Sequence, residues 1–159
     1  GGLDFNETKM LELATKKNNW YVEYIMKMTP DEILPGVIPF LQATKQRGLR
    51  TALGSASKNA PVILERVNLL AYFDLIIDGN EVGKAKPDPE VFLKAAERLG
   101  LNPAECLVFE DAEAGIEAAL NANMKVVGVG DKVILKKANM VIDGFSETEP
   151  DIFIALGKL

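Results

Sequence analysis

The chain has 159 residues, of which 48% are hydrophobic and 26% are charged, and its formal net charge is -5 at pH 7. This composition is typical of a globular protein with one main core, because the length is short for two full domains. The negative charge argues against nucleic acid and anionic membranes as partners. The sequence has no histidine and one cysteine, so it offers no Ser-His-Asp triad and no intrachain disulfide, and any bound metal would have oxygen ligands.

No apolar run approaches the roughly 18 residues that a membrane span needs, and no signal peptide opens the sequence. We therefore expect a cytoplasmic protein. Apolar residues recur at three- and four-residue steps over residues 7–28, which predicts one long amphipathic helix. The segment 29–36, with two prolines and a glycine, then breaks the helical pattern.

Beyond this segment, short apolar runs alternate with predicted helices. Pro39 falls in the first turn of a helix that ends at Gly48, and Asp88-Pro89 begins another that ends at Gly100. The runs do not alternate in polarity, which predicts strands that are buried on both faces of a parallel sheet. The sequence thus predicts a doubly wound α/β fold. The expected strands are residues 50–54, 75–78, 106–109, 125–129 and 140–143.

In such folds the ligand lies beyond the carboxyl ends of the strands. The first informative end is Gly54-Ser-Ala-Ser-Lys-Asn, which precedes a predicted helix. Small residues, hydroxyl groups, free N–H groups and Lys58 together indicate a phosphate-binding loop. The alternative interpretation is that Ser57 or Asn59 only caps the following helix.

Lys86 follows another strand and stands before Pro87-Asp-Pro89, which restricts the backbone on one side of the lysine and helps to orient its ammonium. The alternative is an ordinary solvated lysine on a loop.

Two adjacent carboxylates, Glu110 and Asp111, end the strand predicted at residues 106–109. Both can turn toward the crevice at the end of the strand, where unpaired negative charges repel and are costly to desolvate. A cation is therefore expected beside them, either Mg²⁺ with several waters or Lys86. The alternative is an acidic helix N-terminus, which Glu113 alone would satisfy.

These segments together resemble a known family. Ser55 at a strand end, Lys86-Pro-Asp-Pro, and Glu110-Asp111 with Ala114-Gly-Ile follow one another in the order of motifs two, three and four of the haloacid dehalogenase superfamily. The segments Gly54-Ser-Ala-Ser-Lys-Asn and Ala60-Pro-Val-Ile-Leu-Glu-Arg are similar to its β-phosphoglucomutase branch in particular. The resemblance covers nearly the whole chain.

The resemblance implies a role for each of these residues. Ser55 would bind the transferring phosphoryl group, Lys86 would balance its charge, and Glu110 and Asp111 would position Mg²⁺. The first predicted helix would be half of a helical cap that closes over the substrate, and its Lys17 and Asn18 would hold the distal phosphate. The phosphate-binding set is then Ser55, Ala56, Ser57, Lys58, Asn59, Lys17 and Asn18.

One motif of that family is not found in this sequence. The missing motif is an apolar strand ending in Asp-x-Asp, which would supply the nucleophile. Asp4 is the earliest aspartate, and no apolar strand precedes it. We therefore expect residues 1–32 to be a partial cap and residues 33–159 an α/β core lacking its first strand. We also expect the native protein to continue upstream, and this chain alone to be inactive.

Three functions remain open at this point. The first is a Mg²⁺-dependent mutase that converts β-glucose 1-phosphate to glucose 6-phosphate. The second is a phosphatase of small molecules, and the third is an inactive phosphate-binding module. The expected partner is a small sugar phosphate, with no nucleic acid or membrane, and the complete protein is expected to be a monomer. The sequence does not distinguish mutase from phosphatase, nor one sugar phosphate from another.

Overall fold

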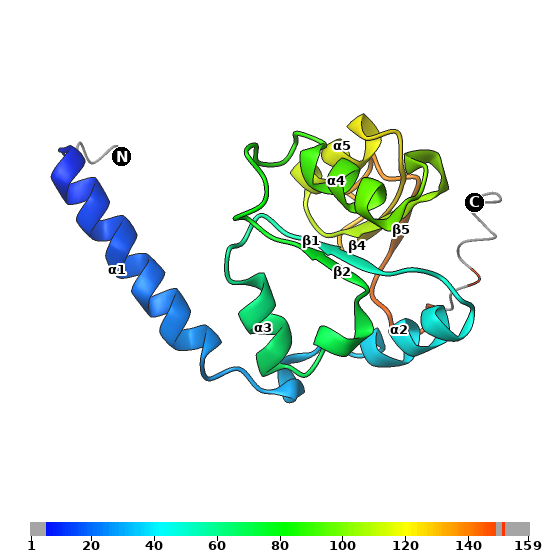
Figure 1. Ribbon diagram of the computed structural model, residues 1–159, viewed down its shortest axis with the longest axis horizontal. Helices are drawn as coiled ribbons and strands as arrows, with labels where there is room; N and C mark the ends of the chain where they lie inside the picture. Colours follow the sequence, from blue (N-terminus) through cyan, green and yellow to red (C-terminus); the bar gives the residue numbers. More distant parts are fainter. Residues whose placement is uncertain (1–5, 149–150, 152–159) are drawn as a thin grey trace.

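The computed structural model describes residues 6–148 and residue 151. Within them, no helix is both long and apolar enough to cross a membrane. The helices are α1 (Glu7–Ile25), α2 (Val37–Gln46), α3 (Ala60–Arg66), α4 (Glu90–Leu99) and α5 (Glu113–Asn121), with short 3-10 helices η1 (Pro30–Glu32), η2 (Leu70–Tyr72) and η3 (Pro103–Glu105). The strands are β1 (Ala52–Gly54), β2 (Leu75–Ile77), β3 (Leu107–Glu110), β4 (Lys125–Val129) and β5 (Met140–Ile142) (Figure 1).

The strands β1 and β2 are parallel and carry apolar side chains on both faces. Leu53 and Ile76 pack with the buried residues of α3, while Ala52, Leu75 and Ile77 belong to the core that α4 covers. Neighbouring residues of a strand point to opposite faces, so an uninterrupted apolar run needs cover on both sides. The predicted α/β fold with parallel strands between helices is confirmed.

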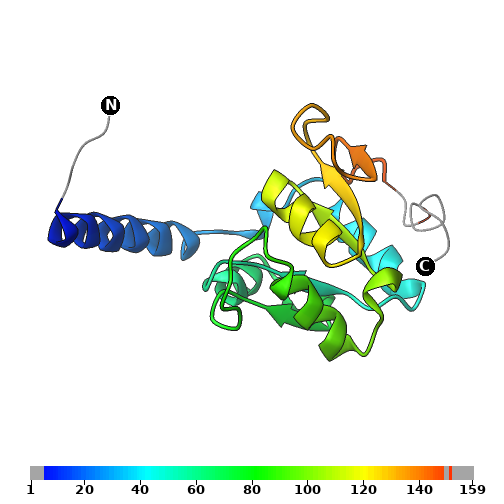
Figure 2. The same ribbon diagram turned by 90° about the horizontal axis from the view of Figure 1, so that it is seen from above.

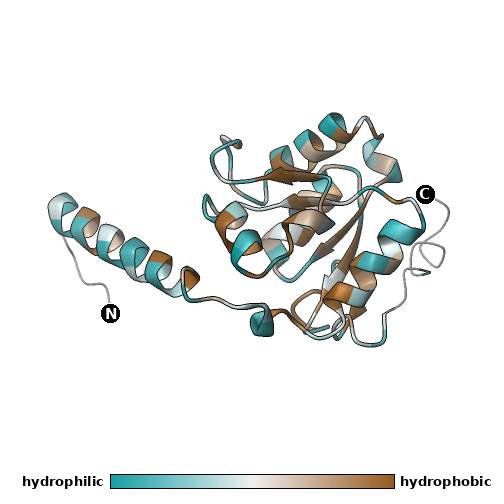
Figure 3. Ribbon diagram, turned by 60° about the horizontal axis from the view of Figure 1, so that its bottom comes forward, coloured by the Kyte–Doolittle hydropathy of each residue, from teal (hydrophilic) through white to brown (hydrophobic). Residues whose placement is uncertain are grey.

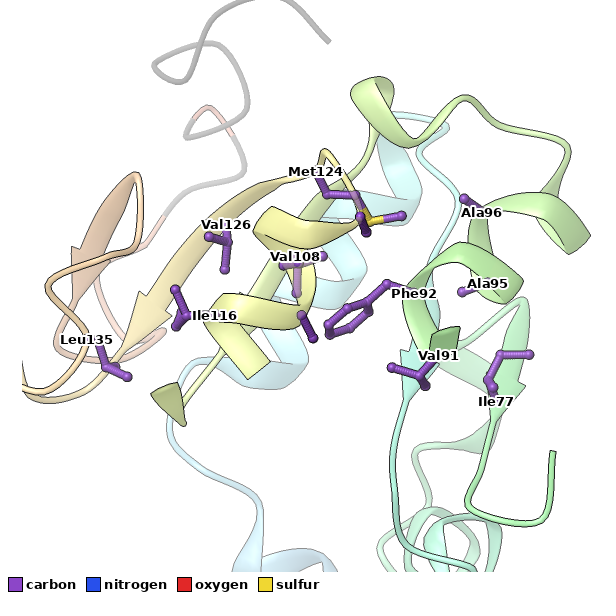
Figure 4. Packing of buried hydrophobic residues seen from close by; sticks show 13 residues of the cluster. Ile77, Val91, Phe92, Ala95, Ala96, Val108, Ile116, Met124, Val126 and Leu135 are labelled. Atoms are coloured by element: carbon purple, nitrogen blue, oxygen red, sulfur yellow. The ribbon is translucent and has the colours of Figure 1, made fainter. Parts of the chain in front are cut away.

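The other three strands form a second parallel sheet in the order β3-β4-β5. On one face, Val108 and Val126 share a core with Ile116 of α5 and with the apolar side of α4 (Figure 4). On the other, the ring of Phe109 lies 5.2 Å from that of Phe40 in α2 and 5.5 Å from that of Phe145, measured between centroids. Both faces of this sheet are therefore also covered.

The parallel strands do not form one continuous sheet. Among residues 6–148, β1 pairs only with β2, and β3 pairs only with β4, so an edge of β1 and an edge of β3 are left without a strand partner. Both sheets nevertheless contribute to one apolar core. The ends of β1 and β3 matter most for function, because the predicted site residues follow these two strands.

The helix α1 extends away from the remainder of the molecule in both views (Figures 1 and 2). The prediction of a helix over residues 7–28 is wrong at its C-terminal end, since α1 ends at Ile25 and the amides of Lys27 and Met28 bond to carbonyls only three residues back. Apolar and polar residues both mark its surface (Figure 3), and Trp20 and Leu11 are exposed. Several apolar side chains of α1 are thus left exposed by the part of the chain that the structure describes.

Candidate functional site

The segment that follows β1 folds into two hydroxyl-supported turns. The Ser55 amide continues the pairing with β2 by donating to the Ile77 carbonyl at 2.9 Å. The Ser55 hydroxyl accepts from the Ser57 amide at 3.1 Å, and the Ser57 hydroxyl accepts from the Asn59 amide at 3.2 Å. Asn59 stands at the N-cap of α3 but its side chain makes no capping bond. The capping alternative therefore fails for Asn59, and Ser57 supports the turn that enters α3.

Gly79 holds this segment against the end of β2. Its amide donates to the Ser57 carbonyl at 3.2 Å, and a Cβ atom at Gly79 would overlap the backbone carbonyl of Ala56. Ser55, Ser57 and Asn59 are half-buried in this arrangement, whereas Ala56 and Lys58 are exposed. The close approach of two backbone segments thus fixes the position of the serines at the end of β1.

Lys86 reaches from its loop to the ends of both sheets. Its ammonium donates to the Gly54 carbonyl at 3.2 Å and forms an ion pair with the Glu110 carboxylate. The exposed fractions are only 19% for the Lys86 side chain and 9% for that of Glu110. Lys86 is therefore not a solvated loop residue. It places one positive charge between the end of β1, beside Ser55, and the end of β3.

Glu110 fits against the first turn of α5 because that turn contains Gly115. A Cβ atom at residue 115 would overlap the Glu110 carboxyl group. The next residue, Asp111, is exposed. No cluster of three or more histidine, cysteine or acidic side chains suited to a metal lies within the described part of the chain. Two adjacent carboxylates still fit Mg²⁺, which commonly takes one or two carboxylates and completes its shell with water and substrate phosphate.

The loop that carries Lys86 is anchored by Glu90. The Glu90 carboxylate accepts from the Gly83 amide at 3.0 and 3.1 Å, from the Lys84 amide at 2.9 Å and from the Lys94 ammonium at 2.6 Å. The hydrogen bond from Lys94, followed by those from the backbone, lowers the pKa of Glu90 from 4.5 to about 2. Sequence reasoning missed this residue, although its place in the first turn of α4, where the helix dipole favours a carboxylate, was a signal that could have drawn attention to it.

We expect Glu90→Gln to loosen this loop and lower stability in a pH-dependent way. The pKa of Glu90 is depressed on folding, so its contribution is present above pH 4.5 and is lost as pH falls toward 2. The difference in unfolding midpoint between this variant and the unaltered protein should be largest near neutral pH and shrink below pH 4.5. Urea titrations across this range measure it. Glu97→Gln, an exposed change on the same helix, is the control, and an equal effect there would contradict the assignment.

Lys17 and Asn18 lie apart from the strand ends. Both are exposed on α1, which extends away from the core (Figure 2), and neither side chain makes a hydrogen bond or ion pair within residues 6–148 and 151. The structure brings together the Ser55 segment, Lys86 and Glu110, with Asp111 alongside, and does not bring Lys17 or Asn18 to them. Their role with a distal phosphate stays a prediction.

These observations define an α/β protein with parallel strands and a lysine–glutamate pair at the strand ends. Comparison with known proteins identifies the family to which this fold and site belong. Residues 4–123 match the haloacid dehalogenase-like hydrolase family, and the chain belongs to this family.

Two curated proteins and one crystal structure illustrate the relationship. A β-phosphoglucomutase from Bacillus subtilis (strain 168) is 40% identical over 138 residues, which cover 87% of this chain and 61% of that protein. A fructose-1-phosphate phosphatase from Escherichia coli (strain K12) is 36% identical over 111 residues, covering 67% of this chain and 58% of that protein. A β-phosphoglucomutase structure from Clostridium difficile has a TM-score of 0.88 at 39% identity and covers 96% of this chain and 68% of its own.

The chain is shorter than the curated relatives that it matches. It spans 61% of the Bacillus subtilis protein and 58% of the Escherichia coli protein. The match to the family and the structural similarity establish the family and the fold of this chain. The activities named above are those of the relatives.

Proposed function

We propose that this protein transfers a phosphoryl group on a sugar phosphate and uses Mg²⁺ to do so. The observation that carries the proposal is the position of the Lys86 ammonium, which contacts both the carbonyl that precedes Ser55 and the carboxylate of Glu110. Phosphoryl transfer depends mainly on positioning and on charges that stabilise the negative transition state. A fixed lysine beside a serine-lined turn and two carboxylates provides this arrangement.

In this proposal the substrate phosphate lies at the end of β1. The Ser55 hydroxyl and the segment formed by Ala56, Ser57, Lys58 and Asn59 bind the phosphoryl oxygens, and Lys86 balances their negative charge. Glu110 and Asp111 hold Mg²⁺, which when bound would offset further negative charge on the phosphoryl group. The ion pair with Lys86 and the space at Gly115 already orient the Glu110 carboxylate toward this proposed phosphate site.

None of Ser55, Lys86, Glu110 and Asp111 is the nucleophile in our proposal. We infer that a further parallel strand ending in an Asp-x-Asp motif lies between β1 and β3 and supplies it. The support for this inference is the break between the two sheets, where β1 and β3 each have one edge without a strand partner among residues 6–148. Lys86 and Glu110 would flank the end of such a strand, so its aspartates would enter the site that these residues already form.

Two relatives favour two versions of the reaction. The similarity to β-phosphoglucomutase supports a mutase that converts β-glucose 1-phosphate to glucose 6-phosphate. In that version Lys17 and Asn18 hold the distal phosphate when α1 closes as part of a cap. The similarity to a fructose-1-phosphate phosphatase supports the alternative, in which the phosphoryl group passes to water.

Product analysis distinguishes the versions. The full polypeptide is incubated with β-glucose 1-phosphate and Mg²⁺, and the products are followed by ³¹P NMR. Glucose 6-phosphate supports the mutase, and inorganic phosphate supports the phosphatase. Absence of turnover, with sugar phosphate still bound, would contradict both and favour an inactive phosphate-binding module.

We expect Asp111→Ala to weaken Mg²⁺ binding by more than about tenfold, because even residues that only support a metal ligand are commonly worth about 10–100-fold in affinity. Isothermal titration calorimetry with Mg²⁺ measures the change. Glu113→Ala is the matched control, since Glu113 is the acidic residue in the first turn of α5. Unchanged affinity in Asp111→Ala, or an equal loss in Glu113→Ala, would refute the metal assignment.

A further inference from the structure

The ammonium of Lys86 lies over an aromatic ring. Its nitrogen is 4.7 Å from the centroid of Phe92, the third residue of α4. Phe92 is only 7% exposed, and Figure 4 shows its side chain extending from α4 into the core that it shares with Val108 and Ile116. A cation within about 6 Å of a ring centroid is attracted by the negative face of the ring.

Gly54 makes room for this contact. A Cβ atom there would lie 3.2 Å from Cε1 and 3.3 Å from Cδ1 of Phe92, which is closer than side chains normally pack. The Gly54 carbonyl also accepts a hydrogen bond from Lys86 at 3.2 Å. One glycine thus admits the ring and supplies an acceptor to the lysine. The Lys86 ammonium therefore contacts a carboxylate, a carbonyl and a ring face.

These contacts differ in what they do to the charge of Lys86. The Glu110 carboxylate neutralises the ammonium, and it would be drawn toward Mg²⁺ if it acts as a metal ligand. The carbonyl and the ring carry no net charge, so they orient the ammonium and leave its charge available for an anion. They also stay in place when the Glu110 carboxylate moves, because Gly54 ends β1 and Phe92 is buried in the core.

We propose that Phe92 is a positioning residue for Lys86: its ring face keeps the ammonium at the end of β1, beside Ser55, when Glu110 is engaged elsewhere. The inference rests on the proposed phosphate site. It adds that the strength of phosphate binding depends on the electron density of the Phe92 ring, which a residue that only fills the core would not show.

The contact itself can be tested without any ligand. Lysine labelled with ¹³C at Cε reports the methylene protons next to each ammonium by NMR, and Lys86→Met assigns the signal of Lys86. We expect this signal upfield of the other lysines, because protons above a ring face are shielded. The upfield shift should disappear in Phe92→Leu and remain in Phe73→Leu, which alters a partly buried phenylalanine that packs against Leu64 of α3 and its neighbours. A Lys86 signal at the ordinary position would overturn the proposal.

Fluorination of the Phe92 ring tests whether its contact with Lys86 contributes to phosphate binding. Trifluorophenylalanine, placed at residue 92 by suppression of a stop codon, keeps the shape of the ring and removes most of the negative charge from its face. Calorimetry with inorganic phosphate in the presence of Mg²⁺ should show the dissociation constant rising about threefold to tenfold, the range that a cation–ring contact supports. The same substitution at Phe73 should leave the constant unchanged.

The two measurements separate the inference from the proposed function. If the unaltered protein binds no phosphate, the proposed function fails, and the NMR signal of Lys86 still decides whether Phe92 positions the lysine. If phosphate binds equally well to both fluorinated proteins, the positioning role is overturned while the phosphate site stands. A weaker affinity at residue 92 alone, together with the lost upfield shift in Phe92→Leu, supports it.

Discussion

Replacing Lys86 by methionine is expected to lower the turnover of β-glucose 1-phosphate by about 100-fold to 1000-fold, the usual effect of removing one group that stabilises transition-state charge. Methionine keeps an unbranched side chain that is one atom shorter than that of lysine, and it removes the cation. The Lys86 ammonium is the positive group that contacts both the end of β1 and Glu110. Steady-state kinetics on the full polypeptide, with circular dichroism to show that the variant is folded, measure the loss.

The control for this change lies two residues away. Lys84 is on the same loop, its side chain is 73% exposed, and it pairs with Asp88 at 3.5 Å. Lys84→Met removes the same charge from the same loop and should change turnover by less than about twofold, since exposed ion pairs contribute little. Equal losses in the two variants would mean that only the overall charge of the loop matters, and the role assigned to Lys86 would be wrong.

Hydrophobic periodicity predicted the bounds of some strands better than those of others. The run at residues 125–129 coincides with β4. The run at 50–54 begins two residues too early, because Thr51 donates its amide to the Asp74 carboxylate at 2.7 Å and Arg50 lies 3.4 Å from the same carboxylate. Thr51 still accepts a backbone hydrogen bond from the Asp74 amide at 2.8 Å, but its own amide bonds to a side chain, and hydrophobic periodicity carries no sign of these polar contacts.

The part of the candidate site that lies at the ends of the strands could be predicted from the sequence. Parallel strands bring their carboxyl ends to one edge of a sheet, so the sequence could place Lys86 near Glu110. Phe92 and Gly115 could not be found in this way. Phe92 has the spacing of any core residue of α4, and Gly115 resembles an ordinary small residue of α5. Their roles depend on which side chain each one meets in the folded chain.

The lysine–glutamate ion pair lies at the break between the two sheets. Lys86 and Glu110 come from opposite sides of the break, and each is the charged partner that the other contacts there. Partly buried opposite charges lose much stability when one partner is removed, because the remaining charge stays desolvated. Removing either charge alone would therefore leave the other one desolvated at the end where the proposed substrate binds.

Gly79→Ala is expected to lower the free energy of unfolding by about 1–3 kcal/mol, the usual cost of inserting a methyl group where there is no space. The new Cβ atom would overlap the backbone carbonyl of Ala56, and backbone cannot turn aside as a flexible side chain can. The Ser55–Asn59 segment would have to move from the end of β2, and phosphate affinity should fall with it. Urea unfolding and phosphate calorimetry on the same preparations measure both losses.

Gly83→Ala provides the matched comparison within the same loop. A Cβ atom at Gly83 would lie 3.7 Å from the Glu90 carboxylate, an ordinary contact distance, so the methyl group has room. Alanine also restricts the unfolded chain, which favours folding by about 0.4–1 kcal/mol at sites that accept it. Gly83→Ala should therefore be neutral or stabilising and should leave phosphate affinity unchanged. If Gly79→Ala behaves in the same way, then contact between the Ala56 carbonyl and Gly79 does not fix the phosphate-binding segment, and its position must depend on the serine hydroxyl bonds alone.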